Sequence, residues 1–272
     1  MSSSLVKKHQ IGERVQLCIE KIAHGGHFVA RLDGAVFFVR HAISGEEVIA
    51  EVTGVEKNYY RADAITILNP SPDRIEGGCR YAGPGLCGGC DFQHIAIDRQ
   101  RKLKSEVITE QFVRLAKMDV YVDVEKVSEE RHWRTRYSAS TDSTGNIGFK
   151  KNASSETIAI TQCPVLIRTI DFPTLPSGSV GANKRIEVSV DTKSNRTISV
   201  MNERRSRDER RPELKIIEGD KSLTYEVLGK SFNVSHTSFW QSNINAPEVL
   251  VDAVLDFADL QEGDHFLDLY GG

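Results

Sequence analysis

The feature that most constrains the fold is a series of short apolar–polar alternations over the first 70 residues. Val15, Leu17 and Ile19 alternate with polar neighbours, and a period of two places apolar side chains on one face of a β-strand. Turn residues separate five such stretches, and Asp33-Gly34 between two of them is a strong hairpin signal. Five short strands at this spacing predict a small, closed or nearly closed OB-like barrel.

The composition is that of an ordinary globular protein. Of the 272 residues, 39% are hydrophobic and 27% are charged. No stretch approaches the roughly 18 apolar residues of a membrane span, and the N-terminus lacks the apolar core of a signal peptide. We therefore expect a cytoplasmic protein with no membrane partner. The formal net charge of -3 gives no bulk signal for nucleic-acid binding, although it leaves a local basic face possible.

Beyond the barrel, the pattern changes to that of an α+β region. A helix is expected from residue 98 to about residue 117, because apolar side chains recur there at helical spacing. Alternation resumes over residues 133–161 and predicts strands. Residues 174–185 and 202–215 are typical of loops.

The final segment combines a helix, a turn and an apolar strand. Asn245 and Glu248 form a capping-box pattern, and Leu250, Val254 and Phe257 follow at helical spacing. Residues 266–270 are then expected to form a strand that ends in Gly271-Gly272. Such a glycine pair is often a plain turn, but this order of elements favours the entry to a Rossmann-like sheet.

Four of the five cysteines form a spaced set. Cys79, Cys87 and Cys90 lie in a glycine-rich segment, and Cys163 precedes Pro164. Structural zinc usually uses two Cys-x2-Cys pairs, and only one is present. An iron–sulfur cluster needs four thiolates, often with a last Cys-Pro. The spacing therefore predicts a metal site and favours iron–sulfur over zinc, with unrelated buried thiols as the alternative.

Three further residues have weaker claims to a role. Cys18 falls within an alternating strand and is expected to be a core thiol. His94 lies close to Cys90 and could be a ligand, but four thiols already suffice. Cys163 as a catalytic nucleophile is disfavoured, since it precedes any cofactor-binding strand and has no base nearby in sequence.

Together these segments resemble the bacterial RNA 5-methyluridine methyltransferases that carry an N-terminal TRAM domain and a [4Fe–4S] cluster. The resemblance covers essentially the whole chain. Its motifs are Gly25-Gly26 through Arg31, Val36-Phe37-Phe38-Val39 with Ser44-Gly45-Glu46, Cys79 with Cys87-Gly88-Gly89-Cys90-Asp91-Phe92-Gln93-His94, Gln162-Cys163-Pro164-Val165-Leu166, Ser238-Phe239-Trp240-Gln241, and Asp268-Leu269-Tyr270-Gly271-Gly272.

The resemblance implies a multidomain fold. Residues 1–70 would form a TRAM barrel that binds RNA, and residues 71–235 an α+β RNA-binding domain with the iron–sulfur loop. Residues 236–272 would supply the first helix and strand of a Rossmann-like methyltransferase domain. The implied ligands of the [4Fe–4S] cluster are Cys79, Cys87, Cys90 and Cys163, and the implied contacts of S-adenosylmethionine are Gln241 and Tyr270.

The reaction implied is methylation of uridine C5, with 23S ribosomal RNA as the expected substrate and partner. In this chemistry a cysteine thiolate adds to C6, C5 accepts the methyl group, and a glutamate removes the C5 proton. The target base must leave its stack. No residue up to 272 matches the nucleophile or the base, so we expect an inactive, monomeric N-terminal fragment. The alternative is a stand-alone RNA-binding module with a structural iron–sulfur or zinc site.

Two groups of cations are candidates for RNA contacts. The barrel group comprises Lys21, Arg31, Arg40 and Lys57. The second group flanks aromatic rings, which suits phosphate contact and base stacking; it comprises Arg134, Arg136, Lys150 and Lys151 with Trp133, Tyr137 and Phe149. For the second group, a half-buried strand pair with ordinary charged edges is an equal alternative.

Overall fold

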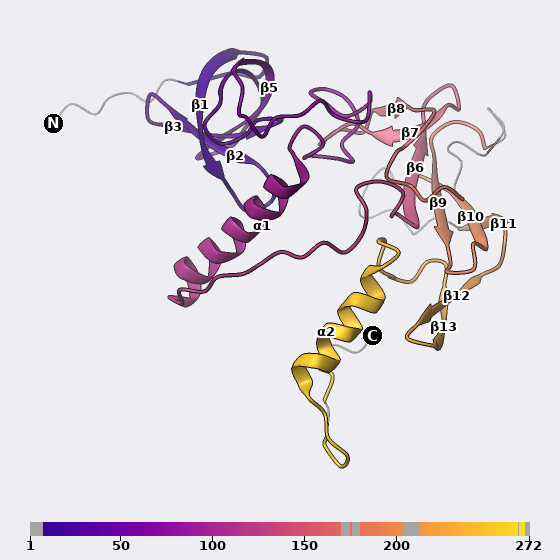
Figure 1. Cartoon of the computed structure of the whole chain (residues 1–272). Helices are drawn as coiled ribbons and strands as arrows, with labels where there is room; N and C mark the ends of the chain where they lie inside the picture. The colour runs from indigo at the N-terminus through magenta and orange to yellow at the C-terminus, as the bar shows by residue number, and fades with distance from the viewer. Residues whose placement is uncertain (1–7, 170–174, 176–179, 204–212, 266, 270–272) are drawn as a thin grey trace. The chain divides into compact units, whose positions relative to one another are not determined.

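The computed structural model describes residues 8–169, 175, 180–203, 213–265 and 267–269 (Figure 1). The chain forms two compact units. The first is drawn from Met1–Glu125, Ala139–Pro164 and Phe172–Arg185, and the second from Lys126–Ser138, Val165–Asp171 and Ile186–Gly272. The expected domain limits at residues 70 and 235 stay predictions.

The first unit begins with a closed five-stranded barrel, which confirms the prediction from the alternation. The strands are β1 (Arg14–Ile22), β2 (Phe28–Leu32), β3 (Ala35–Arg40), β4 (Glu47–Val55) and β5 (Tyr60–Asn69). Neighbours follow the order β1-β2-β3-β5-β4, and β1 also pairs with β4, which closes the barrel. Asp33 and Gly34 both have positive φ, as a two-residue hairpin turn requires.

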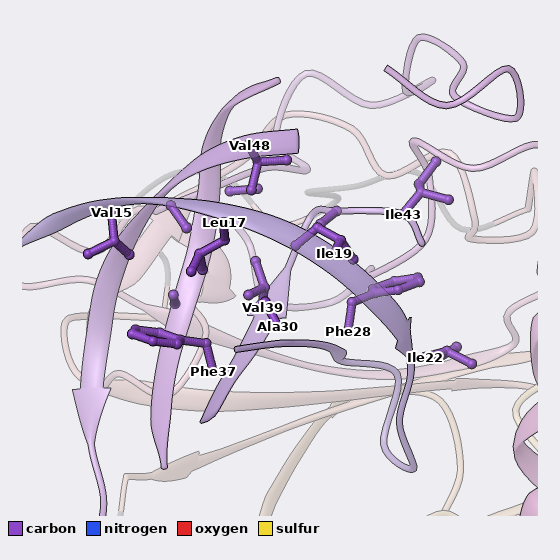
Figure 2. Close-up of a cluster of buried hydrophobic side chains, with 14 of the residues drawn as sticks. Val15, Leu17, Ile19, Ile22, Phe28, Ala30, Phe37, Val39, Ile43 and Val48 are labelled. Carbon is purple, nitrogen blue, oxygen red and sulfur yellow. The ribbon is translucent and has the colours of Figure 1, made fainter. Parts of the chain in front are cut away.

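The barrel interior is filled by the inward-facing residues of every strand. Figure 2 draws 14 side chains of this core, among them Leu17, Phe28 and Phe37. Leu17 is 1% exposed, and Phe37 is fully buried. Burial of each such side chain stabilises the fold by roughly 1.5–3 kcal/mol, so the core is the main source of the barrel's stability.

Cys18 is exposed, so the expectation of a core thiol is wrong. The pleat of β1 buries Leu17 and Ile19 and therefore turns the residue between them outward. Position in the alternation decided the orientation of this side chain, although cysteine is often a core residue.

A helix follows the barrel at the expected place. Helix α1 (Ile97–Gln111) continues as a π-helical turn, η1 (Phe112–Ala116). Leu103 is fully buried in the barrel core cluster, and Val107 packs against it, so this face attaches the helix to the barrel. Further along, Phe112 and Leu115 are exposed.

A second sheet contains six strands in the order β11-β10-β9-β6-β7-β8. They are β6 (Arg136–Thr141), β7 (Ile147–Lys150), β8 (Thr157–Ala159), β9 (Lys184–Val190), β10 (Arg196–Asn202) and β11 (Lys215–Glu218). Antiparallel β6–β7 and β7–β8 pairs confirm the strands expected over 133–161. The expected loops 174–185 and 202–215 lie partly outside the described residues. At their described ends, β9 begins within the first loop, and β10 ends and β11 begins within the second.

Strands β12 (Ser222–Val227) and β13 (Lys230–Ser235) form a hairpin before helix α2 (Ala246–Ala258). The helix begins where the capping-box pattern predicted, with Pro247 in its first turn. Asn245 nevertheless makes no side-chain cap; its amide donates to the Val127 carbonyl oxygen at 3.1 Å. The capping box is therefore absent, since the backbone of Asn245 has helical angles (φ −93°, ψ −16°), whereas an N-cap residue has non-helical ones.

No described side chain of α2 is buried. Leu250 and Val254 are exposed, and Phe257 is 91% exposed. Leu267–Leu269 form no strand. The expectation of a strand over 266–270 is therefore wrong for these three residues, while residues 266, 270, 271 and 272 lie outside the described residues. A strand needs a hydrogen-bonding neighbour, and no described strand pairs with this segment. Among the residues described, no helix is long and apolar enough to span a membrane.

Adjacent residues of β1 provide a test of the barrel register. Leu17→Ala removes a buried side chain and should lower the free energy of unfolding by about 2–5 kcal/mol. Cys18→Ala is the matched control, and it should change that free energy by no more than about 0.5 kcal/mol. Urea unfolding followed by circular dichroism measures both. Equal effects of the two substitutions would contradict the register.

Candidate functional site

Three of the candidate ligand cysteines lie on an irregular loop between β5 and α1, residues 77–91, here called the cysteine loop. Cys79, Cys87 and Cys90 are all half-buried. The loop is folded by backbone bonds, including one of 3.0 Å from the Cys87 N–H to the Tyr81 carbonyl oxygen. The Gly89 N–H donates to the Cys87 sulfur at 3.4 Å. Contacts of this type orient and tune thiolate ligands.

The fourth cysteine belongs to a segment that lies beside this loop. The Tyr81 hydroxyl is 3.0 Å from the Thr161 hydroxyl and accepts the Thr161 backbone N–H at 3.1 Å. Arg80 also donates to the Thr161 hydroxyl, at 3.0 Å. Cys163, two residues further along, is half-buried as well. The structure thus brings the segment with Cys163 next to the loop with the other three cysteines.

The turn between β7 and β8 supports the middle of the cysteine loop. Gly88 donates its N–H to the Lys150 carbonyl oxygen at 3.0 Å, and Cys87 forms a β-bridge with Lys151. A Cβ atom on Gly88 would lie 2.9 Å from the backbone of Asn152. Glycine is therefore required for this close approach.

A thiolate-bound group fits the chemistry of this region, although no closed ligand geometry is visible. Among the described residues, no three Cys, His, Asp or Glu side chains form a group that could hold a metal ion. Four half-buried thiols and a glycine-rich backbone with an N–H on sulfur are nevertheless the donor set that iron–sulfur clusters use. His94, the other candidate ligand, donates from Nε2 to the Ala42 carbonyl oxygen at 3.1 Å.

A buried arginine attaches the cysteine loop to the barrel. The Arg40 side chain, 7% exposed, donates to Asp91 Oδ1 from Nε at 3.0 Å and from Nη2 at 2.5 Å. It also lies 4.0 Å from Asp63 Oδ1. Burial raises the pKa of Asp63, while Arg40 and the Gly85 N–H that this carboxylate accepts oppose the rise. Two loop residues, on either side of Cys87, are therefore held by the barrel.

The expected RNA-binding cations of the barrel are mostly engaged within the protein. Arg40 is buried beneath the cysteine loop, so its expected role on an open RNA face is wrong. Lys21 pairs with Glu110 at 2.6 Å, and Arg31 pairs with Glu20. Lys57 is exposed.

A second buried ion pair holds the chain that leaves the barrel. Glu46 accepts hydrogen bonds from Arg74 Nε and Nη2, each at 2.6 Å, and from the backbone N–H groups of Ile43 and Ser71. Burial alone would raise the pKa of Glu46, but these hydrogen bonds outweigh it and lower the pKa. The carboxylate therefore stays charged and fixes the start of the segment that becomes the cysteine loop.

Sequence reasoning missed a row of side chains on the outside of the barrel. Phe38 of β3 is half-buried and aligns with Val29 of β2 and Arg61 of β5. The Tyr59 ring meets Phe38 edge-on at 5.1 Å, and the Arg61 guanidinium lies 5.5 Å from the centre of the Tyr59 ring. The signal was available, because inward-facing Phe37 and Val39 require Phe38 to face outward.

In the second unit, Gln241 lies on a segment held by its neighbours. The Thr135 N–H and hydroxyl donate to the Ser242 carbonyl oxygen at 2.8 and 3.1 Å. Trp240 stacks on Tyr225 with ring centres 4.6 Å apart. Gln241 itself is half-buried. Tyr270, the other candidate contact of the cofactor, lies outside the described residues.

The second cation group has mainly structural contacts. In the second unit, Arg136 donates to the carbonyl oxygens of His236 and Ser238 at 2.6 and 2.8 Å, and Tyr137 is buried. In the first unit, Lys150 donates to the Ser155 carbonyl oxygen at 2.7 Å. These contacts favour the interpretation as half-buried strands with charged edges. The Arg134 guanidinium lies 5.1 Å from the centre of the Trp133 ring.

The second unit also contains an open cavity of about 570 Å³. Its lining mixes both charges with one indole ring, and comprises Ser128, Glu129, Glu130, Arg131, His132, Trp133, Arg168, Ile244 and Asn245. His132 is fixed there by a 3.0 Å hydrogen bond between Nδ1 and the Leu166 carbonyl oxygen.

Comparison with known proteins identifies the family. Residues 8–65 match the TRAM domain. An uncharacterized RNA methyltransferase of Streptomyces avermitilis is 34% identical over 297 residues, which cover 96% of this chain and 68% of that protein. This chain belongs to the RNA methyltransferase family. A 23S rRNA (uracil(1939)-C(5))-methyltransferase RlmD of Shewanella woodyi, a further relative, is 26% identical over 97% of this chain and 67% of its own length.

A solved structure supports a multidomain methyltransferase fold. The Pyrococcus abyssi tRNA (uracil-54, C5)-methyltransferase, in complex with S-adenosyl-L-homocysteine, matches with a TM-score of 0.63 and 18% identity. The match covers 91% of this chain and 65% of that chain. A Streptomyces coelicolor RNA methyltransferase is likewise covered over 64% of its length. The chain therefore spans about two thirds of the length of these family members.

His41, next to the buried Arg40, makes the stability of the first unit sensitive to acid. Burial lowers the His41 pKa from 6.5 to about 4, with help from the charges of Arg40 and His94. The folded chain therefore binds fewer protons than the unfolded chain between about pH 4 and 6.5. Stability conferred by neutral His41 is present above pH 6.5 and is lost as the pH falls toward 4.

The substitution His41→Asn should reduce this loss. Asparagine does not titrate and tolerates the left-handed backbone, φ 62°, of position 41. The parent should lose up to roughly 3 kcal/mol more than the variant between pH 6.5 and 4. Urea unfolding at a series of pH values in this window measures the difference. Parallel pH profiles would show that His41 does not carry the effect.

Proposed function

We propose that this protein methylates C5 of a uridine in RNA, with S-adenosylmethionine as the methyl donor and 23S ribosomal RNA as the substrate. The observation that carries the proposal is the 34% identity to an RNA methyltransferase over nearly the whole chain. The N-terminal barrel, which matches the TRAM domain, supports an RNA substrate. The Shewanella relative, named for a 23S rRNA uracil, supports the choice of ribosomal RNA. Monomeric action in the cytoplasm is part of the same proposal.

The reaction itself calls for a covalent step. Uracil C5 becomes nucleophilic only when a thiolate adds to C6 and forms an enolate. S-adenosylmethionine, when bound, supplies the methyl group, and loss of the C5 proton then allows the thiolate to leave. We assign none of the five cysteines to this addition, since four are the proposed cluster ligands and Cys18 lies on the outer surface of the barrel. The residues of this chain are proposed to hold the RNA and the cofactor.

Gln241 is proposed as a contact of S-adenosylmethionine, together with Tyr270. Support for Gln241 comes from its placement, because Thr135 and the stacked Trp240 fix the backbone on both sides of it. A side chain on such a fixed segment loses little freedom when it binds a ligand.

We also propose that Cys79, Cys87, Cys90 and Cys163 hold a [4Fe–4S] cluster. The position of Thr161 against Tyr81 supports a shared site, and the Gly89 N–H on the Cys87 sulfur supports thiolate ligation. When bound, the cluster would tie the cysteine loop to the segment that carries Cys163.

Iron content tests the cluster. Protein purified without oxygen should be brown and contain about four irons per chain. Cys163→Ser should lose most of the iron and colour, whereas Cys18→Ser, the matched control on the barrel surface, should retain both. Colourless parent protein with one zinc would contradict the proposal and favour the zinc alternative.

Deletion of the gene tests the reaction. It should abolish 5-methyluridine at one position of large-subunit ribosomal RNA, as measured by mass spectrometry of digested RNA. The intact gene should restore the modification, and a gene with Gln241→Ala should restore much less of it. Loss of the modification from transfer RNA would correct the substrate. Unchanged 5-methyluridine in both RNAs would favour an RNA-binding module without this activity.

A further inference from the structure

We propose that the outer face of the barrel at strands β3 and β5, with the residues that directly precede β2 and β5, is a stacking platform for single-stranded RNA. This platform, here called the ring face, consists of His27, Phe38, Tyr59 and Arg61. The proposal rests on the RNA-binding part of the proposed function and identifies the residues of the barrel that contact the bases.

The rings lie together at the surface. Phe38 and Arg61 are register partners on adjacent strands. Tyr59 meets Phe38 edge-on, with ring centres 5.1 Å apart, and the His27 ring is also nearly perpendicular to Phe38, with ring centres 6.5 Å apart. All four residues are half-buried. Each residue is therefore partly accessible to solvent.

The core of the barrel does not account for these rings. The core cluster contains Phe37, with Tyr60 packed against it, and these are the immediate neighbours of Phe38 and Tyr59. Single exposed aromatic residues are common on protein surfaces. Three rings and a guanidinium in mutual contact are less so, and RNA-binding proteins use such planes to stack unpaired bases.

The charges of the ring face also suit RNA. Burial, with the charges of Arg61 and Arg40, lowers the pKa of His27, so its ring is neutral near pH 7 and can stack as an uncharged plane. Arg61 retains 43% exposure of its side chain, with Glu56 3.6 Å away. It can therefore contact a phosphate beside a stacked base.

The position of the ring face relates it to the cysteine loop. Gly26, next to His27, lies so close to Phe92 that a Cβ there would be 3.3 Å from the Phe92 ring. Phe92 follows Asp91, which Arg40 holds to the barrel. An RNA strand on the ring face would therefore pass beside the loop that carries Cys90.

Binding of a fluorescent single-stranded RNA to the 272-residue chain tests the platform. A mixed-sequence RNA of about 12 nucleotides lies within the site sizes of OB folds, and anisotropy reports its affinity. Tyr59→Ala and Phe38→Ala should each weaken binding about 5- to 150-fold, as expected for loss of a stacked base. Tyr59→Phe keeps the ring and should remain within about twofold of the parent. Tyr121→Ala, which removes an 84% exposed ring elsewhere in the first unit, should bind like the parent.

The salt dependence separates stacking from simple charge attraction. Ring substitutions should lower affinity without changing the slope of log K against log salt, because stacking releases no counterions. Arg61→Gln should reduce the magnitude of this slope by about one. A change of slope in Tyr59→Ala would contradict a stacking role. Thermal unfolding checks that the variants are folded. If Phe38→Ala is unfolded, Tyr59→Ala provides the measurement, because Tyr59 lies just before β5 and not within a strand.

Failure of the platform and failure of the proposed function give different results. If the parent binds RNA and the folded ring variants bind equally well, the platform is wrong while RNA binding stands; the face would then suit a protein partner. If the parent binds no RNA even at low salt, the RNA-binding part of the proposed function fails and the platform fails with it.

Discussion

The contact of Arg40 with Asp63 and Asp91 is the interaction on which the candidate sites of the first unit depend. A buried guanidinium is costly unless carboxylates compensate it, and here one carboxylate belongs to the barrel and the other to the cysteine loop. Backbone hydrogen bonds within the loop shape it, and the Arg40 contact fixes it to the barrel. The position of Cys87 and Cys90 is thus set by a barrel that carries neither residue.

The same strand shows how one face of a sheet can serve two purposes. Phe38 and Arg40 have the same parity and both point away from the barrel core. The cysteine loop covers Arg40 and leaves Phe38 half-buried. The boundary of the loop therefore decides which outward residue becomes a structural contact and which stays available to a ligand. A ring face at this boundary is where an RNA strand could contact barrel and loop together.

Sequence patterns predicted the barrel, α1 and the start of α2, because each depends on local periodicity and turn chemistry. The residues that the patterns misjudged depend on distant segments that cover them or on the backbone angles at one position. Arg40 was expected to face RNA, but a loop 50 residues away covers it. Asn245 was expected to cap α2, but its backbone has helical angles and its side chain makes no cap. Cys18 is a different case. Its place between inward-facing Leu17 and Ile19 predicts an outward side chain, and the expectation of a core thiol came only from the residue type.

The C-terminal segment contains one element whose backbone hydrogen bonds are internal and one whose backbone hydrogen bonds need a neighbouring strand. Helix α2 satisfies its hydrogen bonds internally, so it is present although its Leu250, Val254 and Phe257 stripe is uncovered. An isolated helix of this length is marginal in water, and its stability therefore depends on a surface that buries this stripe. Leu267 and Leu269 are exposed as well, but their segment cannot form a strand without a neighbour to accept and donate backbone hydrogen bonds. The two elements differ because the helix has its hydrogen-bond partners within its own segment, whereas the partners of a strand lie on a neighbouring strand.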